Sequence, residues 1–234
     1  MTLYYSGATT VASVAIATLT EIGVTACFVG GMACRLYGNS RLPQVRWRRP
    51  LAVVPAYRDC VKDLDILCLG SPWNQEELKR QVVIANPSFY TVPAKTPGAT
   101  YAVLWYRQYS FSRRCKVDLL FPGDMDIPSV PIANIEYPEQ GKPCAPFTLV
   151  FLLKLQAWAQ HLDSTEERFR IKSATDALDL RTMLPIARTR GLSIRRVEAY
   201  LPHSFVASAV SRVRRFVGKW PETLDQWRAL GFNV

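Results

Sequence analysis

The feature that most constrains the fold is a change of hydrophobic pattern near residue 145. Residues 64–69 form an apolar run, and residues 87–122 alternate as strands do, for example in TYAVLWYRQYS and RRCKVDLLFPG. From Phe147 onward apolar residues recur with helical spacing, as in TLVFLLKLQAWAQHL and SFVASAVSRVRRFVGKW. The sequence therefore predicts a mixed α/β (α+β) core with a β-sheet over residues 1–145 and a helical region over residues 146–234.

The apolar stretch near the N-terminus, residues 8–24, predicts a packed helix. No Lys or Arg precedes it, and Thr, Ser and Glu21 interrupt it, so it is neither a signal peptide nor a membrane span by pattern. A short buried strand is expected at residues 26–29, a break at the following two glycines, and a helical turn over residues 32–37. No membrane partner is expected.

The basic composition of the chain does not by itself identify the kind of molecule that it binds. The formal net charge of +10 suits a nucleotide or nucleic acid, but an ordinary solvated basic surface explains it equally well. The chain has 6 cysteines without CxxC spacing and only 2 histidines, which argues against structural zinc. Most cysteines lie in apolar segments, so we expect buried free thiols and a reducing, cytoplasmic location.

Paired acidic residues at the start of an apolar strand are the strongest chemical signal. In VKDLDILCLG, Asp63 and Asp65 are separated by one residue and therefore share one face of a strand. Two neighbouring carboxylates repel unless a cation lies between them, and Mg²⁺ prefers such oxygen ligands. A polar strand entrance is the simpler alternative. Asp118, in KVDLL, is flanked by apolar residues in a second expected strand and can add a third carboxylate.

Two glycines join an expected strand to an expected helix at Gly30 and Gly31. Backbone N–H groups of such a turn can approach a phosphate closely. A phosphate-binding turn together with three strand carboxylates is suited to phosphoryl transfer, in which two Mg²⁺ ions, or Mn²⁺, hold the attacking and leaving oxygens.

These three segments resemble the signatures of the nucleotidyltransferase superfamily, whose fold is that of DNA polymerase β. FVGG resembles its hG[G/S] motif, DLDIL its [D/E]h[D/E]h motif and VDL its h[D/E]h motif, where h is apolar. Within it, the chain resembles compact fungal-type members, with a helical tail similar to that of bacterial abortive-infection (AbiEii-like) and toxin enzymes. The resemblance implies that Gly30 and Gly31 lie near the triphosphate, that Asp63 and Asp65 bind both metals, and that Asp118 binds the catalytic metal and helps deprotonate the acceptor.

The resemblance extends to the helical region. Lys154 lies in the apolar helix FLLKLQAW, and Asp176 and Asp179 lie three residues apart on one helical face. In toxin-type relatives such positions serve the nucleotide, which implies that Lys154 neutralises triphosphate charge with support from Asp176 and Asp179. The alternatives are a lysine that extends to the surface and aspartates that face solvent or pair with Lys172.

The spacing between the glycines and Asp63 departs from the family pattern. Without residues 45–62 the chain would read SRLPQ-DLDIL, similar to a typical family stretch in which Ser40 accompanies the nucleotide site. Residues 45–62 are therefore expected to be a surface-loop insertion or a translated intron, and they carry net +4 of the total charge. Either origin puts the activity of this form in question.

Arginines are frequent in the helical region and leave a second class of function open. They are Arg188, Arg190, Arg195, Arg196, Arg212, Arg214 and Arg215, with Lys219 beside them. A solvated face or an RNA or tRNA acceptor surface explains them. The resemblance thus implies an intracellular, ATP- or other NTP-binding nucleotidyltransferase that acts on an RNA, tRNA or protein acceptor. The alternatives are a non-catalytic nucleotide-binding protein and a basic RNA-binding module.

Overall fold

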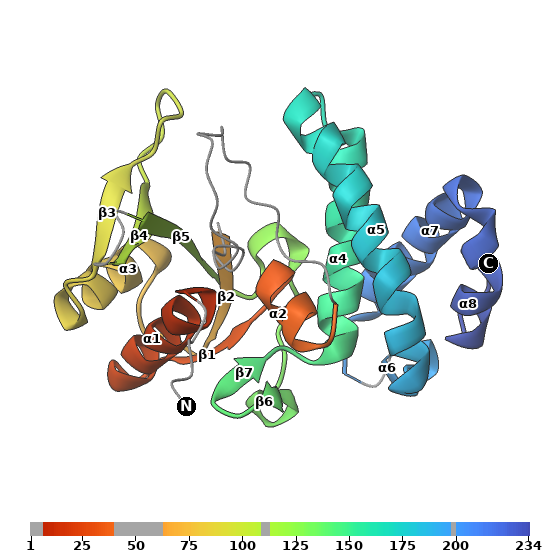
Figure 1. Cartoon of the computed structure of the whole chain (residues 1–234), viewed down its shortest axis with the longest axis horizontal. Coiled ribbons are helices and arrows are strands. Elements are labelled where there is room, and N and C mark those ends of the chain that lie inside the picture. The colour runs from red at the N-terminus through yellow and green to blue at the C-terminus, as the bar shows by residue number, and fades with distance from the viewer. Residues whose placement is uncertain (1–6, 40–62, 109–112, 198–199) are drawn as a thin grey trace, which may run out of the picture. The chain divides into compact units, whose positions relative to one another are not determined.

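A computed structural model describes residues 7–39, 63–108, 113–197 and 200–234. These residues form one mixed seven-stranded sheet and eight α-helices, which confirms the predicted α/β class with a C-terminal helical region (Figure 1). The chain divides into two compact units. Among the described residues, the first contains 7–32, 63–108, 113–121 and 137–143, and the second contains 33–39, 122–136, 144–197 and 200–234. No helix in the described ranges is both long enough and apolar enough to cross a membrane.

The first unit is built on the sheet, with strand order β3-β4-β5-β2-β1-β7-β6. Its central pair, β2 and β5, is parallel, whereas β1–β2, β3–β4 and β4–β5 are antiparallel. The strands are β1 (Thr25–Phe28), β2 (Asp63–Leu69), β3 (Phe89–Pro93), β4 (Ala102–Gln108), β5 (Arg113–Leu120), β6 (Glu136–Glu139) and β7 (Lys142–Cys144). The helices joined to them are α1 (Gly7–Glu21), α2 (Gly30–Leu36) and α3 (Gln75–Ala85).

One face of the central strands is a continuous apolar layer. Leu64, Val117 and Leu104 are register partners across β2, β5 and β4, and all three are buried. Helix α1 contacts β1, helix α3 contacts β3 and β5, and the two helices contact each other, so they cover this face (Figure 1). Because side chains alternate along a strand, the intervening residues must project from the opposite face. The candidate site lies on that opposite face.

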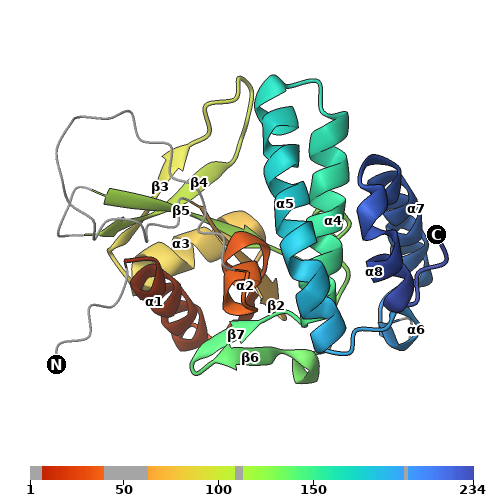
Figure 2. The same ribbon diagram turned by 45° about the vertical axis from the view of Figure 1, so that its right-hand side comes forward.

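The second unit is helical, as the periodicity after Phe147 predicts. It contains α4 (Phe147–Asp163), α5 (Glu167–Thr189), α6 (Ile194–Val197), α7 (His203–Lys219) and α8 (Leu224–Ala229). Helices α4 and α5 run side by side in both views (Figure 2). Buried aromatic rings pack between the helices. The ring centroids of Trp158 on α4 and Phe216 on α7 are 4.9 Å apart, and those of Phe151 on α4 and Trp227 on α8 are 5.2 Å apart. The apolar stripe of α7 is therefore core.

The cysteines behave as the sequence predicts. The five described cysteines, Cys27, Cys34, Cys68, Cys115 and Cys144, are buried, and none of them forms a disulfide with another described cysteine. Burial raises the pKa of Cys27 and of Cys68 to about 12, so these thiols stay protonated at neutral pH. They are small apolar core residues rather than nucleophiles.

Candidate functional site

The structure brings the three predicted carboxylates to one face of the sheet. Asp65 on β2 is the register partner of Asp118 on the parallel strand β5. Asp63 precedes Asp65 by two residues and so projects from the same face. Asp63 is exposed, Asp65 is half-buried, and the Asp118 side chain is 31% exposed, whereas their strand neighbours Leu64 and Val117 are buried. Three acidic side chains from two strands that are distant in the sequence thus share an accessible face.

The predicted glycine turn lies directly against this group. Gly30 has φ +58°, and a Cβ added to it would lie 2.0 Å from Oδ2 of Asp65. The backbone N–H of Val29 donates to the carbonyl of Asp65 at 3.1 Å. Position 30 therefore requires glycine for both its backbone conformation and its close approach to the carboxylate. By contrast, a Cβ at Gly31 would meet nothing within 4 Å, so packing among the described residues gives no reason for glycine there.

A lysine that the sequence analysis missed lies among the carboxylates. Lys116 is the register partner of Asp63, and its Nζ is 2.7 Å from Oδ2 of Asp118. Partial burial alone would lower the pKa of Lys116, but the hydrogen bond to Asp118 and the negative charges of the three aspartates raise it overall. Strand alternation in KVDLL already places Lys116 and Asp118 on one face, so the signal was present in the sequence.

The side-chain oxygens of Asp63, Asp65 and Asp118 are of the type that binds hard divalent cations, because they are carboxylate oxygens on an accessible face. As placed within the described ranges, no three His, Cys, Asp or Glu side chains converge closely enough to form a metal-ligand group. The ammonium of Lys116 supplies the positive charge next to Asp118 instead. Mg²⁺ binding at Asp63, Asp65 and Asp118 stays a prediction.

The second group of predicted residues forms a buried ion cluster within the helical unit. Nζ of Lys154 on α4 is 3.1 Å from Oδ1 of Asp176 and 3.3 Å from Oδ2 of Asp179, both on α5. The Lys154 side chain is 10% exposed, and the two aspartates are about 1% exposed. The alternative expectations for this segment, a surface lysine and solvent-facing aspartates, are therefore wrong, because the three charges face one another across the α4–α5 interface.

Further polar contacts complete this cluster. Nδ1 of His161 is 2.6 Å from Oδ2 of Asp176, and Nδ2 of Asn39 donates to Oδ1 of Asp179 at 3.0 Å. Burial alone would raise the pKa of Asp176, but the hydrogen bond to His161 and the charge of Lys154 hold it below its usual range. Burial would likewise lower the pKa of Lys154, but the Cys34 thiol and the facing carboxylates raise it.

These internal contacts are sufficient to account for the cluster as a structural element that stabilises the helical unit. The predicted role of Lys154, Asp176 and Asp179 in nucleotide binding stays a prediction. Sequence reasoning missed His161 and Asn39, since neither lies in a motif. Ser40 and the expected insertion at residues 45–62 lie outside the described residues.

Several arginines of the helical region are neutralised by acidic partners. Arg215 makes two hydrogen bonds to Asp163, at 2.9 and 2.6 Å, and Arg190 pairs with Glu136 at 2.5 Å. The net positive charge of this region is therefore smaller than the number of its arginines suggests.

Comparisons with known proteins do not assign the chain to a family. No protein-family model matches it, and no curated protein is significantly similar to it. Its function must therefore be inferred from the placement of its side chains.

Proposed function

We propose that this chain is a metal-dependent nucleotidyltransferase, which transfers a nucleoside monophosphate from an NTP to an acceptor and releases pyrophosphate. The observation that carries the proposal is the register of Asp65 opposite Asp118, with Gly30 packed against the Asp65 carboxylate. Core packing does not account for it, because the carboxylates lie on the accessible face and the glycine turn is held against one of them. The resemblance to the superfamily motifs supports the same reaction.

Each residue has a definite part in this proposal. Asp63, Asp65 and Asp118 would hold Mg²⁺, since their oxygens are the donors that this ion prefers. The bound metal would offset the charge of the triphosphate and favour departure of pyrophosphate. Asp118 would accept the proton of the acceptor hydroxyl. Gly31, beside which the structure leaves open space, would let the triphosphate approach the backbone.

A non-catalytic nucleotide-binding protein is the second candidate, and one observation favours it. Lys116 is 2.7 Å from Asp118 and already offsets the charge of the carboxylate that the reaction would use as a proton acceptor. A nucleotide could then bind beside the glycines without turnover.

The test uses the full chain, α-labelled NTPs and Mg²⁺ or Mn²⁺, and follows transfer of label to added RNA, to protein or to the chain itself. Asp65→Asn and Asp118→Asn keep side-chain size while removing charge, and Asp225→Asn is the control because Asp225 is exposed on α8. We expect label transfer by the unaltered chain and by Asp225→Asn, and a loss of at least ~100-fold in the other two. Full activity of Asp65→Asn would contradict the proposal, and nucleotide binding without transfer would establish the second candidate.

A further inference from the structure

The face of the sheet that carries Asp63, Asp65 and Asp118 also carries aromatic and basic side chains on the neighbouring strands. Register places Asp63, Lys116, Trp105 and Tyr90 in one row across β2, β5, β4 and β3. Two residues along the strands, Arg107 on β4 faces Arg114 on β5. Because side chains two residues apart share a face, both arginines project from the face that carries the three aspartates.

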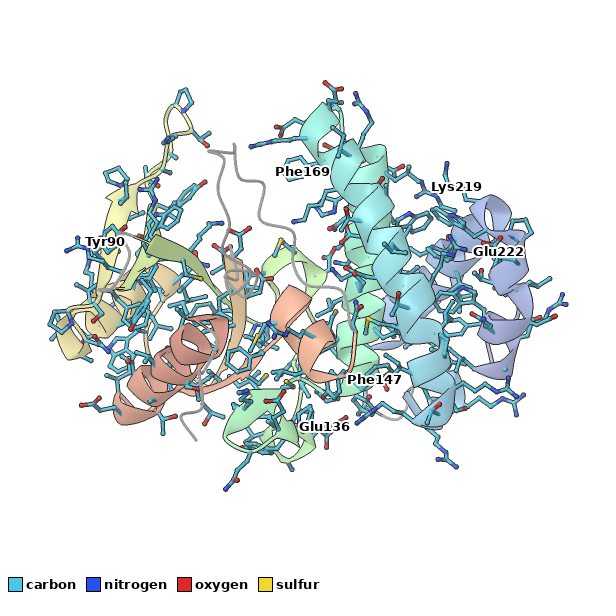
Figure 3. The ribbon with its side chains drawn as sticks, in the orientation of Figure 1. Tyr90, Glu136, Phe147, Phe169, Lys219 and Glu222 are labelled. Atoms are coloured by element: carbon cyan, nitrogen blue, oxygen red, sulfur yellow. The ribbon has the colours of Figure 1, made fainter. Side chains whose placement is uncertain are left out.

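These four side chains stack in pairs. The guanidinium of Arg107 lies 4.8 Å from the ring centroid of Tyr90, and that of Arg114 lies 4.8 Å from the ring centroid of Trp105. Both arginines are exposed and both rings are half-buried. Figure 3 labels Tyr90, which marks the β3 end of this surface. We call Tyr90, Trp105, Arg107 and Arg114 the Arg–aromatic ladder.

The charges of the Arg–aromatic ladder are uncompensated within the described part of the chain. Like charges directly opposite each other destabilise a sheet. Among the described residues, no carboxylate lies within ion-pair distance of Arg107 or Arg114, although Arg190 and Arg215 have acidic partners. Two half-exposed rings that carry two unpaired arginines are therefore poorly explained by folding alone, and an anionic partner would remove the repulsion.

The form of the surface indicates which anion it fits. Aromatic rings and guanidinium planes offer stacking surfaces to unpaired bases, and arginines contact the phosphates between them. Bases in a duplex are already stacked on one another, and an acidic peptide would use the arginines but not the rings. The row from Tyr90 to Asp63 crosses three strand spacings, on the order of 15 Å, which accommodates a short single strand rather than one nucleotide.

We infer that the Arg–aromatic ladder binds single-stranded nucleic acid and directs its end toward Asp63, Asp65 and Asp118 as the acceptor. The binding part of this inference stands alone, whereas the acceptor part rests on the proposed nucleotidyl transfer. The chain's net charge of +10 is consistent with such a ligand.

The binding test measures fluorescence anisotropy of labelled single-stranded RNA and DNA, about 12 nucleotides long, over a salt series without NTP. The variants are Arg107→Gln/Arg114→Gln and Trp105→Leu. The matched control is Arg168→Gln, because Arg168 is an exposed arginine 4.7 Å from the ring centroid of Phe169 on α5. Circular dichroism checks the fold of each variant. If Trp105→Leu fails to fold, the variant Arg107→Gln/Arg114→Gln still tests the inference.

We expect the unaltered chain and Arg168→Gln to bind single strands alike. The double arginine variant should bind at least about 10-fold more weakly, with a salt slope reduced by roughly 1.4 if both arginines contact phosphates. Trp105→Leu should weaken binding by roughly 10- to 100-fold while the salt slope stays unchanged. Equal affinity of the double arginine variant, equal affinity for duplex, or equal affinity for a mononucleotide would overturn the inference.

Adding labelled NTP separates this inference from the proposed function. Label on the end of a strand, reduced in the ladder variants, supports both. Strand binding through the ladder with no transfer to any acceptor refutes the proposed function and the acceptor role while the binding surface stands. Transfer to another acceptor that ladder variants perform normally refutes the acceptor role and leaves the proposed function intact.

Discussion

Two carboxylate clusters in this molecule share chemistry but differ in environment. On the sheet, three aspartates lie on an accessible face with Lys116 among them, and the side chains of Lys116 and Asp118 are 34% and 31% exposed. In the helical unit, Asp176 and Asp179 are about 1% exposed and face Lys154. In the first cluster Lys116 pairs with Asp118 at a partly exposed position, whereas in the second Lys154 lies between two buried carboxylates.

The difference shows how to separate a ligand site from a structural ion cluster. A buried charge is tolerated only when paired and hydrogen-bonded, so a closed cluster is sufficiently explained by the fold. Neighbouring carboxylates on an accessible face repel one another, and they can also be stabilised by a cation that arrives from solution. On this ground we propose a functional role for the sheet aspartates and a structural role for the helical cluster.

The largest expected effect is on the closed cluster. Lys154→Met leaves two buried carboxylates facing each other without their shared cation, so we expect a loss of about 3–5 kcal/mol in the free energy of unfolding. Urea denaturation followed by circular dichroism measures it. Lys172→Met, an exposed position on the adjacent helix α5, should change stability by less than ~0.5 kcal/mol. Similar stabilities for the two variants would show that the cluster is not structural.

The two glycines of the turn should respond in opposite ways. Gly30→Ala places a methyl group on the Asp65 carboxylate in a left-handed backbone conformation, so we expect a loss of at least ~2 kcal/mol in stability. Gly31→Ala meets open space and should change stability by less than ~1 kcal/mol, in the stabilising direction for a helical position. Thermal denaturation compares them. If Gly31→Ala also leaves nucleotide affinity unchanged, the phosphate role of Gly31 is wrong.

The pH dependence of stability should report on the closed cluster. The pKa of Asp176 is lowered in the folded protein. A carboxyl group with a lowered folded pKa stabilises the fold above its unfolded value of about 3.9, and this stabilisation is lost as pH falls through the folded pKa. Urea denaturation between about pH 5 and pH 2.5 should therefore show a steeper loss for the unaltered chain than for Asp176→Asn. Parallel curves would contradict the assignment of this carboxyl group.

The sequence predicts what depends on local pattern and misses what depends on packing. Strand alternation is enough to place Asp63 and Asp65 on one face, and the apolar neighbours of Asp118 predict its strand. The pairing of Lys154 with Asp176 joins residues on two helices, and only the packing of α4 on α5 brings them together. Strands β6 and β7 have 4 and 3 residues in a proline-rich segment, too few to show a period.

The smallest expected effect concerns Lys116, the residue that links the two kinds of cluster. Its ammonium pairs with Asp118 as Lys154 pairs with Asp176, but the pair is one-third exposed and worth about 0.4–1 kcal/mol. Lys116→Met should therefore change stability little and tighten Mn²⁺ binding by about 2- to 5-fold, since the competing cation is removed. Calorimetric titration with Mn²⁺ measures the change, Lys116→Arg retains the charge, and Lys142→Met breaks the ion pair with Glu139 as a control. Weaker Mn²⁺ binding by Lys116→Met would mean that the lysine supports the metal site rather than competing for it. Lys116 would then be part of the accessible cluster in the way that Lys154 is part of the closed one.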